Sequence, residues 1–365
     1  MSNTNLTRAK NTKNDEFYTQ WADIEREVNA YLEYNPDVFR GKIILCPCDD
    51  PYESNFFKFF ALHFNAIGLK KLISTCYSGS SISNMQLSLF DYETAENKTT
   101  KVPHKLIIDE KDREKYKIND LRAVEHLLAN KEFALTRLKG DGDFRSAEVT
   151  ALRDEADIII TNPPFSLFRE FLAWIMEANK KFLIISNKNC LTYKEVFPLI
   201  KDNKLWSGRT EWSGGMWFET TNINNIDNAV NGVNYKNVPS IWLTNLDHGR
   251  RHQPLPLTTM ADSLKYSKHK DFKGKETFDR YDNYDAIEVP YTDIIPSDYT
   301  GVMGVPITYL EKYCPEQFEI VGATESEGKG FSSGLWHEHS NISQALVNGQ
   351  KVYKRIFIKH KESDQ

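Results

Sequence analysis

The 365-residue sequence has few of the features that would assign it to an exported, membrane or metal-binding class. It has no run of 18 apolar residues, and residues 1–17 are polar, so we expect neither a membrane span nor a secretory signal. Its five cysteines are odd in number and lie mostly in apolar segments, which is typical of reduced thiols in a cytoplasmic protein. Beside the C-x-C at Cys46 and Cys48 no second Cys/His pair stands at zinc spacing, so no metal site is predicted.

Two nucleotide-binding fingerprints are also absent. Neither the G-x-G-x-x-G turn nor the P-loop pattern G-x-x-x-x-G-K-[ST] occurs, so a bound cofactor is not expected to present a pyrophosphate to a glycine turn. The net charge of -5 argues mildly against a nucleic-acid partner. However, residues 249–275 hold seven Lys/Arg against two Asp, and residues 351–361 hold five against no acidic residue. These basic segments are either a solvated surface with a basic tail or a site for phosphates.

The sequence does have an alternation of apolar runs and helical segments. Strands are expected at residues 42–46, 71–76, 105–108, 133–138, 157–161 and 181–186, and helices at 53–67, 166–178 and 192–200. This alternation predicts a doubly wound, mostly parallel α/β sheet in three layers. Residues 78–105 read as a long loop. Beyond residue 205 only 240–246 is a clear strand, so we place a domain boundary there.

Polar residues follow four of the expected strands. They are CDDP at 48–51, GDGDF at 140–144, TNPPF at 161–165 and SNKN at 186–189. In an open α/β sheet the ligand lies beyond the carboxyl ends of the strands, so these segments predict one crevice. Carboxylates in place of glycines suit a ligand with a ribose, an adenine amine and a positive charge, and S-adenosylmethionine has all three.

The segment DIIITNPPFSLF at 157–168 ends its apolar run at an asparagine and two prolines. The prolines hold φ at about -65° and bias the preceding residues toward extended geometry, so residues 162–165 form a stiff platform. The Asn162 side-chain oxygen and the Pro163 carbonyl can accept both hydrogens of an exocyclic amine, and Phe165 offers a stacking face. This geometry suits methyl transfer to a planar amine.

N-P-P-F after an apolar strand resembles the [DNS]-P-P-[YFW] motif of N6-adenine methyltransferases. Further segments resemble, in order, those of the EcoRI-type adenine-specific DNA methyltransferases: NDEFYTQ, ILCPCDDPYESNFFKFFAL, LKGDGDFRS, TNPPFSLFREF, GVPITYLEKYCPEQFEIVG and VNGQKVYKRIFIKHK. The resemblance runs nearly end to end. It implies a Rossmann-like S-adenosylmethionine-binding catalytic domain at 1–205, with the end of the sheet and a target-recognition region at 206–365.

The resemblance also implies residue roles. Asn162, Pro163, Pro164 and Phe165 would hold and stack an adenine that is flipped out of duplex DNA. The implied cofactor contacts are Phe17, Tyr18, Thr19, Cys46, Asp49, Asp50, Asp143, Phe144 and Asn162. CDDP departs from the usual D-x-F-x-G-x-G, so which of Asp49 and Asp50 touches the cofactor stays open. The ribose-binding acid usual after the second strand is missing, because TCYS stands at 75–78.

The implied partner is double-stranded DNA, together with a cognate restriction endonuclease acting on the same site, and the implied state is a monomer. Candidate DNA contacts are Arg209, Trp212, Trp217, Arg250, Arg251, Lys354 and Arg355, although a core or solvated role is the simpler reading of each. The 78–105 loop is either a segment that orders on DNA or a plain insertion. The alternatives are methyl transfer to RNA adenine or protein glutamine, and a catalytically silent DNA-binding protein.

Overall fold

The structure is a computed structural model that describes residues 18–77, 103–115, 122, 124, 134–220, 226–324, 331–332, 334–337, 340 and 342–361. The chain divides into two compact units. Unit 1 comprises Met1–Asn187 and Gly208–Asp247, and unit 2 comprises Lys188–Ser207 and His248–Gln365. The chain therefore passes between the units three times, and the boundary expected near residue 205 lies close to the second of these passages.

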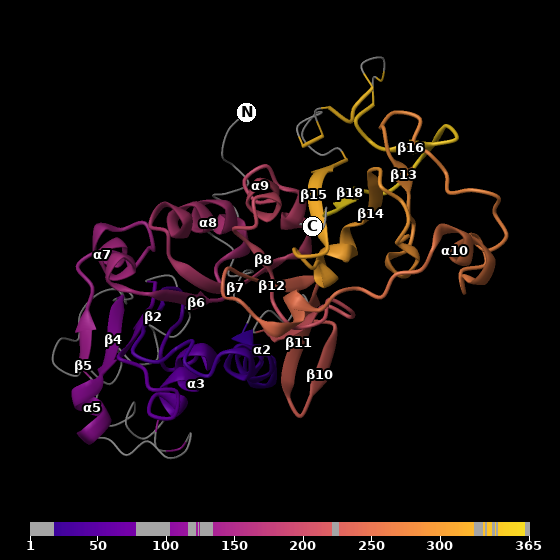
Figure 1. Ribbon diagram of the computed structural model, residues 1–365. Coiled ribbons are helices and arrows are strands. Elements are labelled where there is room, and N and C mark those ends of the chain that lie inside the picture. Colours follow the sequence, from indigo (N-terminus) through magenta and orange to yellow (C-terminus); the bar gives the residue numbers. More distant parts are fainter. Residues whose placement is uncertain are drawn as a thin grey trace. The chain divides into compact units, whose positions relative to one another are not determined.

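A mixed, mostly parallel sheet forms the centre of unit 1 (Figure 1). Its seven strands in this unit run in the order β5 (Ala134–Arg137), β4 (His104–Asp109), β3 (Lys71–Thr75), β2 (Ile43–Cys46), β6 (Ile158–Thr161), β7 (Lys181–Asn187) and β12 (Ser240–Thr244). The predicted strands are confirmed. β2 pairs in parallel with β3 and β6, and β6 with β7. β4 is antiparallel to both its neighbours, so β5 again points the same way as β3.

Helices cover both faces of this sheet. α2 (Trp21–Tyr34) and α3 (Asn55–His63) lie on one side and α7 (Ala147–Glu155) and α8 (Phe168–Glu177) on the other (Figure 1). α3 begins where the Ser54 hydroxyl accepts the backbone N–H of Phe56, the usual N-cap arrangement. Its phenylalanines pack with Val28 of α2 and Ile44 of β2 in one buried cluster. α2 was not expected from the sequence, although Ile24, Val28 and Tyr31 have helical spacing.

Unit 1 holds a second, antiparallel sheet. Its order is β1 (Tyr18–Thr19), β9 (Met216–Glu219), β11 (Val233–Val238) and β10 (Asn228–Val230). Met216 and Phe218 of β9 join the same buried cluster as the helices. The expectation that residues beyond 205 hold only one strand was wrong, because these short polar strands are defined by their partners rather than by an apolar run.

Unit 2 contains a four-stranded sheet and small helices. The sheet order is β13 (Ile287–Glu288), β14 (Met303–Pro306), β18 (Arg355–His360) and β15 (Phe318–Ala323). The remaining elements are η2 (Lys188–Thr192), α9 (Phe197–Lys201), β8 (Trp206–Ser207), η3 (Gly249–His252), α10 (Met260–Tyr266), η4 (Thr292–Ile294), η5 (Ile307–Lys312) and the hairpin β16 (Leu346–Val347) and β17 (Gln350–Lys351). The helix expected at 192–200 is shorter than predicted, because α9 begins only at Phe197. Residues 351–361 do not form the solvated basic tail that was one of the two readings of this segment, because Ile356, Phe357 and Ile358 are buried in β18. Within the described ranges no helix has the length and apolar character needed to cross a bilayer.

Candidate active site

The carboxyl ends of the parallel strands bring the predicted site residues to one edge of the sheet. Asp49 and Asp50 follow β2, Asn162 follows β6, and these strands are neighbours. The chain turns from β2 to β3 on one side while β6 lies on the other, which is the switch point where open α/β sheets bind ligands. Thr161, the residue before Asn162, lies beside Asp49.

Asp49 is held by the start of α3. Its Oδ1 accepts a hydrogen bond from the Ser54 hydroxyl at 2.6 Å, and its carbonyl accepts one from the Ser74 hydroxyl. Burial raises the pKa of Asp49 to about 6, although the Ser54 hydrogen bond opposes the shift. Asp50 accepts the Tyr52 backbone N–H at 2.9 Å, and burial raises its pKa as well. Both carboxylates are thus costly to ionise without a ligand.

Besides Thr161 Oγ1, three buried oxygen atoms at this edge have no hydrogen-bond partner in the part of the chain that the structure describes. They are Thr19 Oγ1, Asp49 Oδ2 and Asp50 Oδ2. Thr19 reaches the site because the Asn55 side chain, at the start of α3, donates to its carbonyl at 2.8 Å. A buried acceptor without a donor costs free energy, so the three oxygens fit a ligand rich in hydroxyl and ammonium groups. Of the neighbouring predicted contacts, Phe17 lies outside the described residues and Tyr18 is described by its place in β1.

The GDGDF segment lies against the end of β3. Gly142 has φ +78°, and a Cβ there would lie 2.2 Å from the Cys76 carbonyl oxygen, so only glycine fits. The carboxylate of Asp143 accepts hydrogen bonds from Arg145, whose Nε lies 2.8 Å away. Phe144 is buried edge-on against Phe171 at 5.0 Å between ring centroids. Asp143 therefore lies in a segment at the carboxyl edge of the sheet, whereas Phe144 packs in the core. The cofactor contacts of both residues stay predictions.

The N-P-P-F segment is extended at the prolines and then turns. Pro164 has φ -57° and ψ 120°, and its carbonyl accepts the Leu167 N–H at 3.0 Å, which begins η1 (Phe165–Leu167). The Pro163 carbonyl accepts no hydrogen bond from any described residue. Phe165 is half-buried and packs against the main core cluster. The platform thus keeps the Pro163 acceptor expected from the sequence, while the Pro164 carbonyl is used within the turn.

His104 is a site residue that the sequence did not reveal. It is the first residue of β4, and because β4 runs against its neighbours, its start lies at the carboxyl edge. Its Nδ1 lies 3.2 Å from Cys76 Sγ. Asp50 joins them, with one ligand-type atom of each residue within 4.8 Å of the others. Asp50 therefore brings a carboxylate to the end of β3, where the sequence lacks one. By contrast, Cys46 is fully buried in the core cluster, and its cofactor contact stays a prediction.

The candidate DNA contacts divide by exposure. Arg209 is exposed and Trp217 is 43% exposed. Four others are half-buried or buried in unit 2: Arg250 pairs with Glu311, Arg251 is buried over the Trp206 ring, Lys354 donates to Thr192, and Arg355 is buried against Glu288. Trp212 is buried in unit 1. The DNA contacts stay predictions, and the exposed pair is better placed for them.

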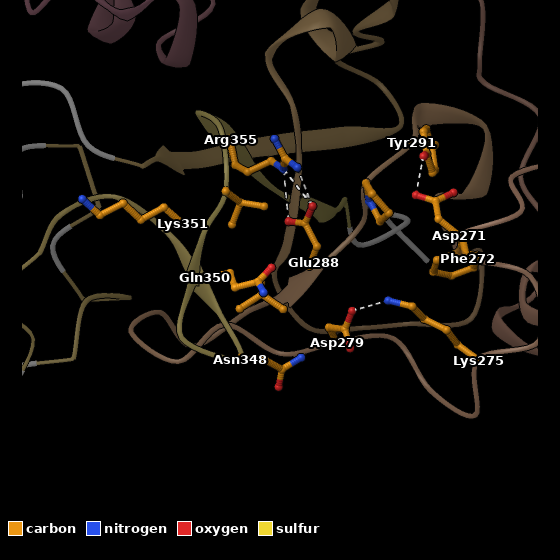
Figure 2. A pocket seen from close by; sticks show the side chains of 13 residues that line it. Asp271, Phe272, Lys275, Asp279, Glu288, Tyr291, Asn348, Gln350, Lys351 and Arg355 are labelled. Carbon is orange, nitrogen blue, oxygen red and sulfur yellow. Dashed lines mark hydrogen bonds and ion pairs between the residues drawn. The ribbon is translucent and has the colours of Figure 1, made fainter.

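A polar cleft of about 600 Å³ lies in unit 2 (Figure 2). Figure 2 shows Arg355 facing Glu288 there in a two-pronged ion pair with Nη2–Oε1 at 2.6 Å. Lys275 pairs with Asp279 elsewhere in the lining of the cleft. Its basic and acidic residues balance, and the cleft is therefore not a strong phosphate site.

Comparison with known proteins gives a consistent result. The family model described as adenine-specific methyltransferase EcoRI matches residues 5–361. The type II methyltransferase M.EcoRI of Escherichia coli is 41% identical, with 98% of this chain and 96% of the relative covered. M.MpnI of Mycoplasma pneumoniae is 32% identical, with 98% of each chain covered, and M.MgeORF184P of Mycoplasma genitalium is 32% identical over 98% of this chain and 99% of the relative. No solved structure matches significantly.

An Asn-Pro-Pro-Phe platform beside paired carboxylates, at one edge of a mostly parallel α/β sheet, is the arrangement expected of an enzyme that methylates an amine. The family match is more specific. The chain belongs to the EcoRI-type adenine-specific methyltransferases, a family whose function is S-adenosylmethionine-dependent methylation of adenine N6.

Proposed function

We propose that this chain transfers the methyl group of S-adenosylmethionine to N6 of an adenine flipped out of double-stranded DNA, at a specific site shared with a restriction endonuclease. The observation that carries the proposal is the set of buried oxygens of Thr19, Asp49 and Asp50 beside the N-P-P-F platform. The type II methyltransferases among its relatives support DNA as the substrate.

The chain's own residues would bind and orient the cofactor. Asp50 lies at the end of β3, where a carboxylate can accept hydrogen bonds from ribose hydroxyls. Asp49, which accepts a hydrogen bond from Ser54, suits the methionine end, whose ammonium needs acceptors. S-adenosylmethionine itself supplies a methyl group already activated on a sulfonium. We also propose that the fold of the catalytic part is Rossmann-like.

The platform would orient the adenine. The Asn162 amide oxygen and the Pro163 carbonyl accept the two hydrogens of the exocyclic amine, which directs its lone pair toward the methyl group. Phe165 supplies a stacking face, and the turn that follows Pro164 fixes its position. The protein therefore contributes alignment and exclusion of water, and the proton lost from the amine passes to solvent. No general base is assigned.

Phosphate contacts are expected chiefly from the basic segment at 249–275 in unit 2. Three exposed lysines there have no ion pair within the described residues: Lys265, Lys270 and Lys273. Lys268 and Lys275 of the same segment pair with Asp293 and Asp279. The unpaired lysines are available to replace counterions on a DNA backbone, and we assign them, with Arg209 and Trp217, to the target-recognition region.

The test is a labelling experiment with methyl-labelled S-adenosylmethionine. Duplex DNA should become labelled at adenine N6, and Asn162→Ala should lower the rate by at least about a hundredfold, because an oriented acceptor is lost from the reacting amine. DNA binding by the variant should remain. Ser166→Ala, exposed on the same turn, is the matched control and should keep its activity.

Two outcomes would count against the proposal. Label on RNA or on a protein side chain, with none on DNA, would favour the alternative substrates. Full activity in Asn162→Ala would remove the role assigned to the platform.

A further inference from the structure

Asp50, Cys76 and His104 form a compact group of three different ligand types. Asp50 follows β2, Cys76 follows β3, and His104 is the first residue of β4. One ligand-type atom of each residue lies within 4.8 Å of the others. The Cys76 Sγ to His104 Nδ1 distance is 3.2 Å. Asp50 is 7% exposed and Cys76 1% exposed, so these two side chains are shielded from bulk water, whereas His104 is half-buried.

The group is more than a local packing arrangement. Asp50 is more than nine-tenths buried, and its Oδ2 has no hydrogen-bond partner in the described part of the chain. Adenine methylation as derived above uses no thiol and no imidazole. Cofactor binding accounts for the Asp50 oxygen, but it leaves the adjacent thiol and imidazole without a role.

A Cys-His-Asp catalytic triad does not fit the geometry. In such a triad one ring nitrogen faces the nucleophile and the other faces the carboxylate. Here both nitrogens of His104 lie close to the Cys76 sulfur, at 3.2 Å and 3.5 Å. Burial also raises the pKa of Cys76 to about 12, so without a cation its sulfur stays a thiol and is a poor nucleophile.

We propose that Asp50, Cys76 and His104 bind a thiophilic divalent cation such as Zn²⁺, with water in a fourth position, and that this ion excludes the methyl donor. One sulfur, one nitrogen and one oxygen ligand with an open position suit tetrahedral zinc. Bonds of about 2.0–2.3 Å place tetrahedral ligands about 3.5 Å apart, so the observed group needs shifts of about 1 Å. The thiol proton leaves to solvent as the sulfur bonds the ion.

The ion excludes the methyl donor because both would use the Asp50 carboxylate, and this step rests on the function proposed above. Asp50 Oδ1 already accepts the Tyr52 N–H, so Oδ2 is the oxygen that remains for a ligand. If Oδ2 accepts from the donor's ribose hydroxyls, it cannot coordinate an ion at the same time. Zinc would then act as a competitive inhibitor at the cofactor end of the site. The ion-binding itself depends only on the three side chains and not on the reaction.

Cobalt(II) is the probe for the ion site, because a thiolate ligand gives it a near-ultraviolet charge-transfer band. The chelator-treated full chain, without DNA or cofactor, is titrated with Co²⁺, and one equivalent should produce the band. Cys76→Ser should abolish it. Cys190→Ser, at a thiol that is equally buried but lies in unit 2, is the matched control and should keep it.

A second variant guards against misfolding. Circular dichroism reports whether each variant folds, and His104→Gln should weaken Co²⁺ binding even if Cys76→Ser proves unstable. No stoichiometric band in the unaltered chain, or a band that is lost in Cys48→Ser but kept in Cys76→Ser, would overturn the site.

Competition is measured separately by equilibrium dialysis of labelled S-adenosylmethionine. At a free Zn²⁺ concentration ten times its dissociation constant, the apparent Kd of the donor should rise about tenfold, and Cys76→Ser should remove most of this rise. An unchanged donor affinity in zinc-loaded protein would overturn the exclusion. A protein that fails to methylate DNA but still shows the cobalt band would instead contradict only the proposed function.

Discussion

Asp49 combines a proposed binding role with a folding cost. Its ordinary pKa of 3.8 rises to about 6 in the folded chain, because burial disfavours the carboxylate more than the Ser54 hydrogen bond favours it. Between these two values the folded protein holds a proton that the unfolded chain has lost. Stability therefore falls as pH rises from about 4 to about 6, and the ionised group costs up to about 3 kcal/mol above that range.

Replacing Asp49 with asparagine should separate these two effects. Asp49→Asn keeps an acceptor for Ser54 but removes the charge, so it should be more stable than the unaltered chain by up to about 3 kcal/mol at pH 8. The difference should shrink toward zero near pH 4, and cofactor affinity should fall. Urea unfolding across this pH range measures the difference, with the exposed Asp202→Asn as control. A gain that does not depend on pH would contradict the assigned pKa.

Arg355 shows why the sequence misleads at the scale of single residues. In the letters KVYKRIFIKHK it is one of five Lys/Arg residues within eleven positions that hold no acidic residue. In the fold its guanidinium is buried against Glu288, 67 residues earlier, and Tyr281 donates to the same carboxylate. Nothing local marks that distant partner, so a structural arginine and a DNA-binding arginine look alike.

Helix α2 provides the clearest example at the scale of elements. Its Glu27 is fully buried and accepts hydrogen bonds from the backbone N–H groups of Arg209 and Thr210, both at 2.7 Å. The segment that begins at Gly208 is thereby tied to a helix near the start of the chain. Arg209, a candidate DNA contact, takes its backbone position from this interaction.

Gly208→Ala tests this junction. A Cβ at Gly208 would lie 2.1 Å from Glu27 Oε1 and 2.6 Å from the Trp242 Cβ, so either the carboxylate or the strand must move. We expect a loss of about 1–3 kcal/mol in the free energy of unfolding, measured by urea denaturation. Gly140→Ala is the control, because the nearest atom to its Cβ would be 4.0 Å away. Equal stability of the two variants would mean that Glu27 does not hold this segment.

At the scale of the whole molecule, the charge is uneven. The chain carries -5 overall, yet Lys265, Lys270 and Lys273 form an exposed group with no ion pair among the residues described. Net charge therefore says little about DNA affinity, which depends on how many phosphates are met by accessible cations.

Removing these three lysines should change the salt dependence of DNA binding. The slope of log K against log salt concentration should become less steep by about 0.9 for each lost contact, or nearly three in all. Fluorescence anisotropy at several salt concentrations measures it. The control replaces Lys42, Lys70 and Lys111, exposed lysines at the amino edge of the sheet, with alanine. If both triple variants change the slope equally, the segment has no special role in phosphate contact.

Much of unit 1 follows directly from the sequence. The buried strands β2, β6 and β7 contain continuous apolar runs, since a strand covered on both faces needs apolar side chains. Their polar ends mark the carboxyl edge, because parallel strands place those ends together. For the same reason the order of residues along the chain is enough to indicate Asp49, Asp50 and Asn162 as candidate site residues.

Tertiary structure alone decided the rest. The direction of β4 sets which end of that strand meets the site, so only the fold could bring His104 to Asp50 and Cys76. The assignment of residues 208–247 to unit 1 likewise depends on strand pairing across the chain. The sequence determined what is local, namely periodicity, turn residues and the motif itself. Pairing partners, burial of charge and pKa depend on groups distant in the chain, and these arise only when the chain is folded.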